Sequence, residues 1–113
     1  MNKNTVSVLG EDYRIHFLGP EDDEALKHCQ GYTDESTREI VVQRDLSDPD
    51  DPSNVSDWPT IRKQTLRHEI VHAFFFESGL GCESSYAQNE ELVDWIARQG
   101  PKLYRAWVEA GAL

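Results

Sequence analysis

Residues 65–76 read Thr-Leu-Arg-His-Glu-Ile-Val-His-Ala-Phe-Phe-Phe. It contains His68-Glu69-x-x-His72, two histidines four residues apart with a glutamate beside the first. On an α-helix, side chains four residues apart lie on one face. Two imidazoles can therefore reach one metal ion, with the Glu69 carboxylate next to them. The stretch predicts a helix that carries a metal site.

The sequence around this stretch predicts where its helix begins and ends. Pro59 follows Trp58 and suits a first helical turn, and Asp57 or Ser56 can cap it. The helix is expected to run to about Glu77 and to stop at Gly79. Upstream, residues 45–57 hold two prolines, five aspartates and three serines, which favours an exposed loop.

The C-terminal part of the sequence predicts two further helices. Ser85-x-x-Gln88 has the form of a capping box, and the helix after it is expected to end at Gly100-Pro101. A last helix is expected over residues 102–110. The residues of this last helix that are expected to pack onto an apolar surface are Leu103, Trp107 and Val108.

The N-terminal half predicts a small sheet. Alternating apolar residues over 5–18 indicate a β-hairpin with its turn at Gly10-Glu11-Asp12, and a short helix is expected before Gly31. Residues 32–37 are polar and turn-prone, whereas the β-branched run 38–44 predicts a strand. We therefore expect one α+β domain over residues 1–113, with a small antiparallel or mixed sheet packed on a helical C-terminal half.

The helix after the capping box offers a third metal ligand. A catalytic zinc takes three protein ligands and leaves one position for water. The apolar residues that mark the inward face of this helix are Leu92, Val93, Ile96 and Ala97, and Glu90 and Asp94 share an edge next to it. Glu91 is rotated by about 100° and is expected to meet solvent. Glu90 is therefore the favoured ligand, with Glu91 kept as the alternative.

Taken together, the two motifs resemble those of a known enzyme group. His68-Glu69-x-x-His72 followed by Asn89-Glu90-x-x-x-Asp94 resembles the gluzincins, the zinc peptidases typified by thermolysin, and from His72 to Glu90 is 90 − 72 = 18 residues. The small size and the helix pair look more like minimal zincins of phage and prophage origin. SprT-like and ImmA-like metallopeptidases are distantly similar. The resemblance covers roughly residues 32–100.

The resemblance implies a role for each residue of the motifs. His68, His72 and Glu90 would bind one Zn²⁺ ion, and Glu69 would be the general base that takes a proton from a zinc-activated water. Asp94 would accept a hydrogen bond from the far nitrogen of His68 and so fix its tautomer. These assignments imply hydrolysis of peptide bonds in a peptide or protein substrate.

The resemblance also implies features outside the two motifs. The strand before the motif helix, Ile40 to Arg44, would hold extended substrate by backbone pairing. A histidine or tyrosine that stabilises the oxyanion follows the second motif in thermolysin-like enzymes, and this chain lacks an obvious one. Tyr86 is the favoured candidate, with Tyr104 and His28 behind it.

Two other functions are weighed against a zinc metallopeptidase. One is a zinc-bearing regulatory or binding module, such as a phage or prophage accessory protein with little or no proteolytic activity. In that case Cys82 or a carboxylate would close the fourth metal position. The other is a metal-free structural protein in which the histidines only pack.

Composition restricts the partners and the location. A formal net charge of −10 argues against nucleic acid, because no basic stripe offsets the acidic field. No apolar run is long enough to span a membrane, and no apolar signal region follows Met1, so a cytoplasmic protein is expected. Cys29 and Cys82 are expected to be free thiols. The sequence does not predict an oligomeric state.

Overall fold

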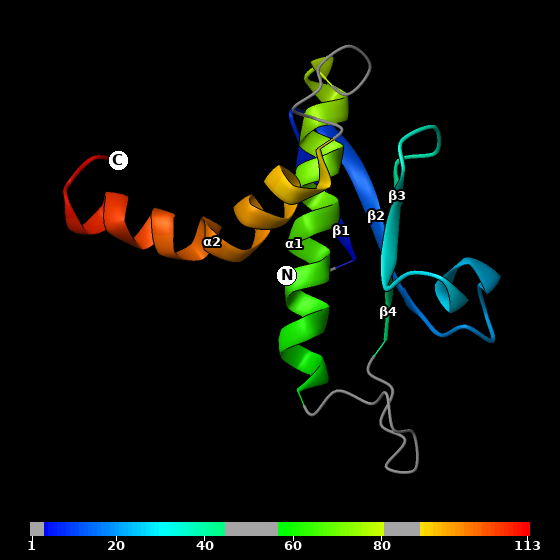
Figure 1. Cartoon of the computed structure of the whole chain (residues 1–113). Helices are drawn as coiled ribbons and strands as arrows, with labels where there is room; N and C mark the ends of the chain where they lie inside the picture. The colour runs from blue at the N-terminus through cyan, green and yellow to red at the C-terminus, as the bar shows by residue number, and fades with distance from the viewer. Residues whose placement is uncertain (1–3, 45–56, 81–88) are drawn as a thin grey trace.

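The computed structural model describes residues 4–44, 57–80 and 89–113. In chain order the elements are β1 (Thr5–Val8), β2 (Glu11–Leu18), the 3₁₀ turn η1 (Glu24–Lys27), β3 (Gly31–Asp34), β4 (Glu39–Gln43), α1 (Trp58–Glu77) and α2 (Glu90–Glu109). Helix α1 lies along the sheet, and α2 crosses α1 near its middle (Figure 1). The predicted α+β fold is confirmed.

The sheet is mixed, with strand order β1-β2-β4-β3. β1 and β2 form the predicted antiparallel hairpin, and β2 then pairs with β4 in parallel. The hairpin turn lies at Leu9 and Gly10, which both have positive φ (50° and 88°), as a type I′ hairpin turn requires. The turn therefore begins one residue earlier than the sequence predicted.

One face of the sheet and one side of α1 form the core. Alternate residues of the strands are buried on this face, since successive side chains in a strand point to opposite sides. These buried strand residues are Val8, Tyr13, Ile15, Ile40 and Val42. From α1, Ala73 is buried among them, and Leu66 and Ile70 pack against the cluster. The core therefore fixes which side of α1 faces the sheet.

The prediction of a turn over residues 32–37 is wrong at its start, because β3 occupies residues 31–34. β3 pairs antiparallel with β4, so that Thr33 lies opposite Ile40. The strand exists because β4 supplies its hydrogen-bond partners, and composition alone does not report such pairing. The true turn follows β3, where Asp34 accepts hydrogen bonds from the Ser36 amide and hydroxyl.

The strand order also overturns the role predicted for Ile40 to Arg44. β4 pairs with β2 on one side and with β3 on the other, so its backbone offers no free edge to a peptide. Among the described strands, β3 lies at the edge of the sheet. Any extended peptide that adds to this end of the sheet must therefore pair with β3.

Helix α2 is continuous, whereas the sequence predicted a break at Gly100-Pro101. Pro101 lies inside the helix and has no N–H to donate to the carbonyl of Ala97. The Ala97 oxygen instead accepts a hydrogen bond from Arg67 Nε of α1, at 2.6 Å. A side chain from another helix thus satisfies the acceptor that proline leaves unpaired.

The prediction that the C-terminal helix packs onto an apolar surface is also wrong. Leu103, Trp107 and Val108 are 39%, 47% and 52% exposed. Every residue from Lys102 to Leu113 is exposed. Figure 1 shows why: the second half of α2 projects away from the sheet and from α1 as an arm.

The structure also bears on the predicted short helix, on the cap of α2 and on membrane spans. The short helix before Gly31 is only the 3₁₀ turn η1, and α2 is capped by Asn89, whose side chain accepts from the Leu92 amide. The Ser85–Gln88 capping box and residues 45–56 lie outside the described residues. Within the described ranges, no helix is both long and apolar enough to cross a membrane.

Glu77 links the end of α1 to the sheet, and its substitution should reveal an acid-sensitive contact. Its carboxylate accepts hydrogen bonds from Arg38 Nε (2.9 Å) and the Tyr13 hydroxyl (2.8 Å). The Arg38 bond, followed by the Tyr13 bond, holds the pKa of Glu77 below its ordinary value. The unfolded chain therefore binds this proton more readily, and the stability from Glu77 is present at neutral pH and lost as pH falls through the folded-state pKa.

We therefore expect Glu77→Gln to lower the melting temperature by a few degrees near neutral pH, and by less near about pH 3. Thermal unfolding of parent and variant at both pH values measures this. Glu91→Gln, at an exposed position near the start of α2, is the matched control and should change little. The same loss at both pH values would contradict the assigned role of the Glu77 carboxylate.

Candidate metal centre

Helix α1 presents the two histidines side by side. The rings of His68 and His72 meet edge to face, with centroids 5.0 Å apart. Their side chains are 18% and 24% exposed, so each imidazole is partly covered and still reachable from solvent. This is the arrangement that the four-residue spacing predicts for one helical face.

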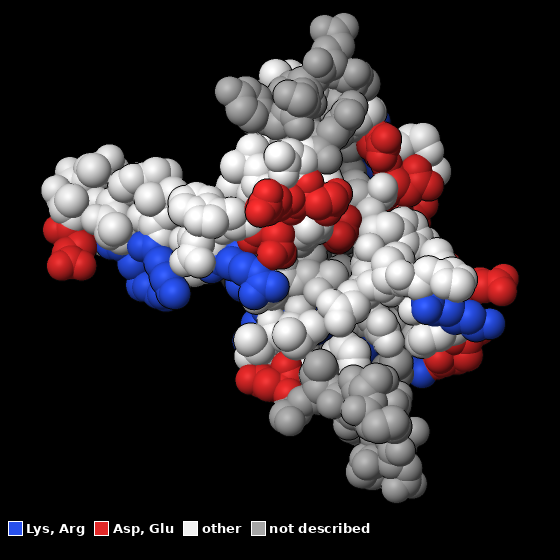
Figure 2. All heavy atoms as spheres, in the orientation of Figure 1, with Lys and Arg blue, Asp and Glu red and all other residues white. Residues whose placement is uncertain are grey.

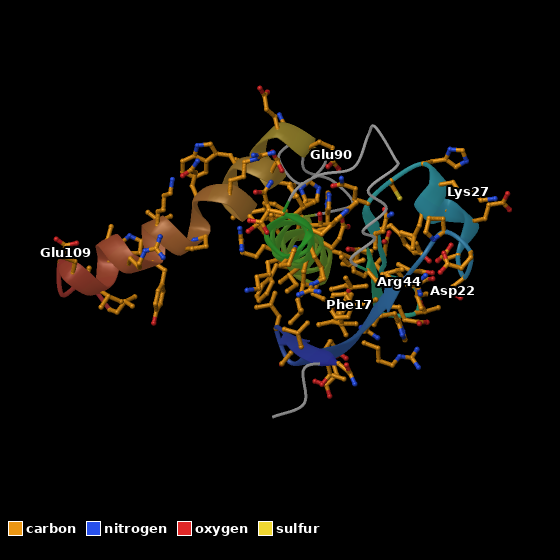
Figure 3. All side chains as sticks on the ribbon, turned by 90° about the horizontal axis from the view of Figure 1, so that it is seen from below. Phe17, Asp22, Lys27, Arg44, Glu90 and Glu109 are labelled. Carbon is orange, nitrogen blue, oxygen red and sulfur yellow. The ribbon has the colours of Figure 1, made fainter. Side chains whose placement is uncertain are left out.

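The first turn of α2 brings Glu90 to both histidines. Glu90 Oε2 lies 2.8 Å from His68 Nε2, and Oε1 lies 2.9 Å from His72 Nε2. Figure 3 shows Glu90 at the start of α2, close to α1. Val93 and Ala97 are fully or almost fully buried in the half of α2 that packs against α1, which fixes the rotation of α2. Glu91 is exposed and does not belong to this group.

The three side chains fit a zinc ion. One ligand atom from each of His68, His72 and Glu90 lies within 4.8 Å of the others. Two ligands about 2.0–2.1 Å from a tetrahedral zinc are separated by about 3.3 Å. The Glu90–imidazole distances of 2.8 and 2.9 Å must open slightly to reach that value, and the widest separation in the cluster, up to 4.8 Å, must shorten. Two imidazoles and one carboxylate are a ligand set that catalytic zinc takes in proteins.

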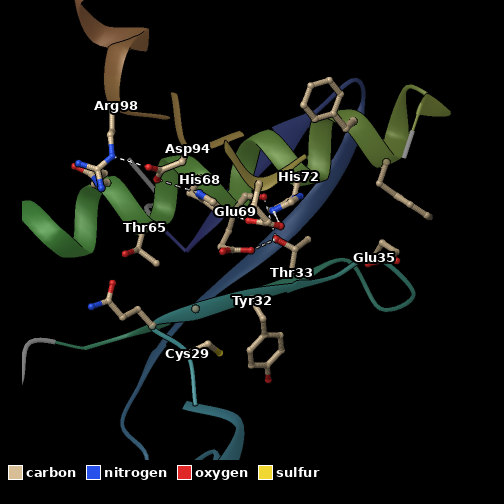
Figure 4. Close-up of a pocket in the computed structure, with 16 residues that line it drawn as sticks. Cys29, Tyr32, Thr33, Glu35, Thr65, His68, Glu69, His72, Asp94 and Arg98 are labelled. Atoms are coloured by element: carbon tan, nitrogen blue, oxygen red, sulfur yellow. Dashed lines mark hydrogen bonds and ion pairs between the residues drawn. The ribbon is translucent and has the colours of Figure 1, made fainter. Parts of the chain in front are cut away.

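Glu69 lies beneath this cluster and is buried, with 7% of its surface exposed. The hydroxyl of Thr33 lies 2.9 Å from Glu69 Oε1 and 2.9 Å from the Glu69 carbonyl oxygen (Figure 4). Burial raises the pKa of Glu69 above its ordinary value, against the Thr33 hydrogen bond, which lowers it. The carboxylate is therefore held in place and disposed to accept a proton.

Asp94 lies one turn after Glu90 and contacts the far side of His68. Its Oδ1 is 3.5 Å from His68 Nδ1, which is an ion-pair distance and longer than an ordinary hydrogen bond. Its Oδ2 accepts a hydrogen bond from Arg98 Nε at 2.6 Å. The Arg98 bond is the main reason that the pKa of Asp94 lies below its ordinary value. Asp94 is thus kept ionised next to the ring that it faces.

An open groove of about 730 Å³ runs past these residues. Its walls come from β3 on one side and from α1 and the start of α2 on the other (Figure 4). The β3 wall includes Gly31, Tyr32 and Thr33, whereas Phe75 and Phe76 line the α1 side. Glu69 and the histidines therefore face an open groove.

Of the other residues predicted for the site, two lie outside the described residues and the rest stand apart from the cluster. Tyr86 and Cys82 lie outside the described residues. Tyr104 is 58% exposed on the α2 arm, and His28 is not among the groove-lining residues. Tyr32 does line the groove, but its hydroxyl donates to Asp23. The predicted oxyanion donor is therefore not found among the described residues.

Two residues of the site were missed from the sequence. Thr33 lies in the segment that was interpreted as a turn, so nothing marked it as a partner of Glu69. Arg98 is four residues after Asp94, and this acid–base spacing on a helix could have indicated the pair. Thr33 contacts Glu69 and Arg98 contacts Asp94, so each of them touches a site residue that was predicted.

Comparison with known proteins found no relative of this chain. No family model matches the sequence, and neither the curated proteins nor the solved structures contain a match.

Proposed function

We propose that this protein is a zinc-dependent peptidase of the minimal-zincin kind, with His68, His72 and Glu90 as zinc ligands. One observation carries the proposal: the Glu90 carboxylate lies within 3 Å of both imidazole Nε2 atoms, at 2.8 and 2.9 Å. The buried carboxylate of Glu69 beside this cluster, at the wall of an open groove, supports hydrolysis over simple metal storage.

The proposed chemistry assigns one task to each side chain. Bound zinc would supply an electrophile and a water whose pKa is lowered toward about 7. Glu69 would accept a proton from the attacking water and deliver it to the leaving amine. Thr33 would hold the Glu69 carboxylate toward the cluster, and Asp94 would fix the tautomer of His68. No residue is proposed for the oxyanion.

The substrate is proposed to be an extended peptide held along β3. The Gln43 amide donates to the Gln30 carbonyl at 2.8 Å, which makes this a hydrogen-bonded pair of the β3–β4 ladder. Hydrogen-bonded and non-hydrogen-bonded pairs alternate in an antiparallel ladder. Gly31 and Thr33 therefore turn their N–H and C=O groups to the free edge, where a peptide can pair with them.

A peptide-library screen with and without a chelator tests the proposal. We expect cleavage that a chelator removes and that added zinc restores. Cleavage that persists in chelator would contradict a zinc mechanism. Stoichiometric zinc without cleavage of any peptide would favour the binding module described next.

A zinc-bearing binding or regulatory module is the second candidate, and a specific observation favours it. Of the tyrosines and histidines in the described groove wall, only Tyr32 is not a proposed ligand, and its hydroxyl is engaged with Asp23. The described residues therefore supply no tyrosine or histidine to stabilise an oxyanion. A zinc site that hydrolyses peptides slowly or not at all would lack such a residue.

Zinc affinity should fall on acidification, because protons compete for the two imidazoles. We expect it to change little above about pH 7 and to fall about 10- to 100-fold per pH unit below about pH 6, since histidine ordinarily titrates near 6.5. Competition with a chromogenic chelator between about pH 5 and 8 measures this. His28→Ala should follow the parent curve, because His28 lies outside the cluster. An affinity independent of pH would contradict histidine ligation.

A further inference from the structure

The groove wall carries two charged residues besides the acids of the metal cluster. Among the described residues that line the groove are four acids and one arginine. Three of the acids belong to the metal cluster or lie beside it, namely Glu69, Glu90 and Asp94. The remaining charged residues are Glu35 and Arg98, which have opposite charges.

Glu35 lies toward one end of the groove. A Cβ on Gly31 would lie 2.9 Å from Thr65 Cγ2, so the start of β3 is adjacent to Thr65 of α1. Thr33 contacts Glu69, four residues further along α1. β3 and α1 therefore run in the same direction along the groove. Glu35 follows Thr33 by two residues and lies beyond Glu69, past the end of β3.

Arg98 lies toward the opposite end. Its partner Asp94 contacts His68, the first of the two histidines along α1. Figure 4 shows Arg98 on the left and Glu35 on the right, with His68 and His72 between them. The groove is therefore basic toward one end and acidic toward the other, and the metal cluster lies in the middle.

Both side chains can take a further partner. Glu35 is exposed, and its carboxylate has no hydrogen-bond or ion-pair partner within the described ranges. The Arg98 side chain is 56% exposed, and its Nε bond to Asp94 at 2.6 Å holds the guanidinium in place. The other four N–H groups of a guanidinium are on its two Nη atoms, and these can bind a carboxylate through two parallel hydrogen bonds.

The surface shows the same division of charge. Figure 2 shows Asp and Glu gathered where α2 crosses α1 and again over the turn after β3, with Lys and Arg on α2 beside the first group. A net charge of −10 alone would favour any basic peptide. A base toward one end of the groove and an acid toward the other instead discriminate the order of charges along a peptide.

The direction of a peptide on β3 decides which of its ends meets each charge. Antiparallel strand pairs are slightly more stable per residue than parallel pairs, so a peptide paired with β3 is expected to run antiparallel to it. The C-terminal part of such a peptide lies toward Gly31 and Arg98. Its N-terminal part lies toward Glu35.

We propose that the groove selects peptides with a basic side chain on the N-terminal side of the metal cluster and an acidic side chain on the C-terminal side. Glu35 binds the basic side chain, and Arg98 binds the acidic one. α1 borders the groove from Gln64 to Phe76, a length of about 18 Å. This length holds about five residues of extended peptide, so the two charges are about four residues apart and point to the same face. The inference rests on the proposed function, which places the peptide along β3.

Two peptides of the same composition test the inference. Both are blocked octapeptides of threonine; one has lysine at its second and glutamate at its sixth position, about 13 Å apart when extended, and the other has the two exchanged. Isothermal titration calorimetry with the full-length Glu69→Gln chain in excess zinc measures their binding without cleavage. We expect the lysine-first peptide to bind about tenfold more tightly, because the exchange turns two weak attractions into two repulsions. Equal affinities, tighter binding of the exchanged peptide, or no binding of either would overturn the inference.

Substitutions at the two ends assign the preference to its residues. Arg98→Gln and Glu35→Gln should each reduce the tenfold preference to about threefold, because each removes one of two contributions. Glutamine can still donate to Asp94 from four residues away. Arg105→Gln and Glu91→Gln make the same changes at exposed positions outside the groove wall and should keep the tenfold preference. Circular dichroism and zinc affinity check that each variant is intact. A preference that stays tenfold in both groove variants would overturn the assignment.

Cleavage by the parent chain separates this inference from the peptidase proposal. A parent that cleaves no peptide, while Glu69→Gln keeps the preference for charge order, would contradict the peptidase and leave the groove as a peptide-binding site. Cleavage of both octapeptides at equal rates, together with equal binding, would support the peptidase and overturn this inference.

Discussion

Glu69→Gln is expected to lower the rate of peptide hydrolysis by at least about 100-fold and to leave zinc affinity within about threefold of the parent. Glutamine can accept the hydrogen bond from Thr33, so the side chain should keep its place. It cannot take a proton from the attacking water at neutral pH. The kcat/KM for one cleaved peptide and a chelator competition on the same samples measure both effects.

The matched control for this prediction is Glu91→Gln. It makes the same chemical change at an exposed position on α2, next to Glu90 and outside the cluster. Its hydrolysis and its zinc affinity should both stay near the parent values. A Glu69→Gln variant that cleaves as fast as the parent would show that Glu69 is not the general base, and only the proposed metal site would remain.

The second large effect is expected on metal binding. Glu90→Gln should weaken zinc binding by at least about 100-fold, because losing even an outer partner of a ligand costs about 10–100-fold. The substitution keeps the size of the side chain but removes the charge that a carboxylate ligand supplies. Zinc affinity at about pH 7.5 measures this, well above the range in which histidine ordinarily titrates.

Comparing Glu90→Gln with Glu91→Gln decides which glutamate is the ligand. The geometry favours Glu90, whose two oxygens lie 2.8 and 2.9 Å from the two imidazoles. Glu91→Gln should therefore bind zinc within about threefold of the parent. The reverse result, with Glu91 essential and Glu90 dispensable, would mean that the first turn of α2 is rotated by about 100° in the metal-bound protein.

Local signals made α1 predictable. Asp57 accepts from the Thr60 amide as an N-cap, Pro59 lies in the first turn, and Gly79 follows the end with a positive φ of 86°. Each signal acts within a few residues, so the sequence contains it in full. The helical spacing of His68 and His72 then fixes their common face without any knowledge of the fold.

Long-range contacts explain what the sequence did not predict. β3 exists through pairing with β4, and α2 continues past Pro101 because Arg67, 30 residues before Ala97, satisfies the freed carbonyl. The arm was expected to pack because apolar helix faces usually do. None of these outcomes has a cause within the segment concerned.

Some residues of the candidate site could likewise be predicted from local spacing, whereas others depend on long-range contacts. Glu90 and Asp94 could be proposed from helical periodicity, since both lie on one edge of the same helix. Thr33 could not, because its contact with Glu69 depends on β3 being the edge strand. Because β4 is paired on both sides, the edge proposed to bind a peptide is β3 and not β4. Nothing in the sequence of residues 40–44 indicates this.

Zinc K-edge X-ray absorption on protein purified without added zinc tests the central proposal most directly. We expect about one zinc per chain, with two imidazole nitrogens and carboxylate and water oxygens at about 2.0–2.1 Å, and no sulfur ligand. That result would establish a histidine–carboxylate site with a position for water. A sulfur shell near about 2.3 Å, or protein that holds no stoichiometric zinc, would contradict it.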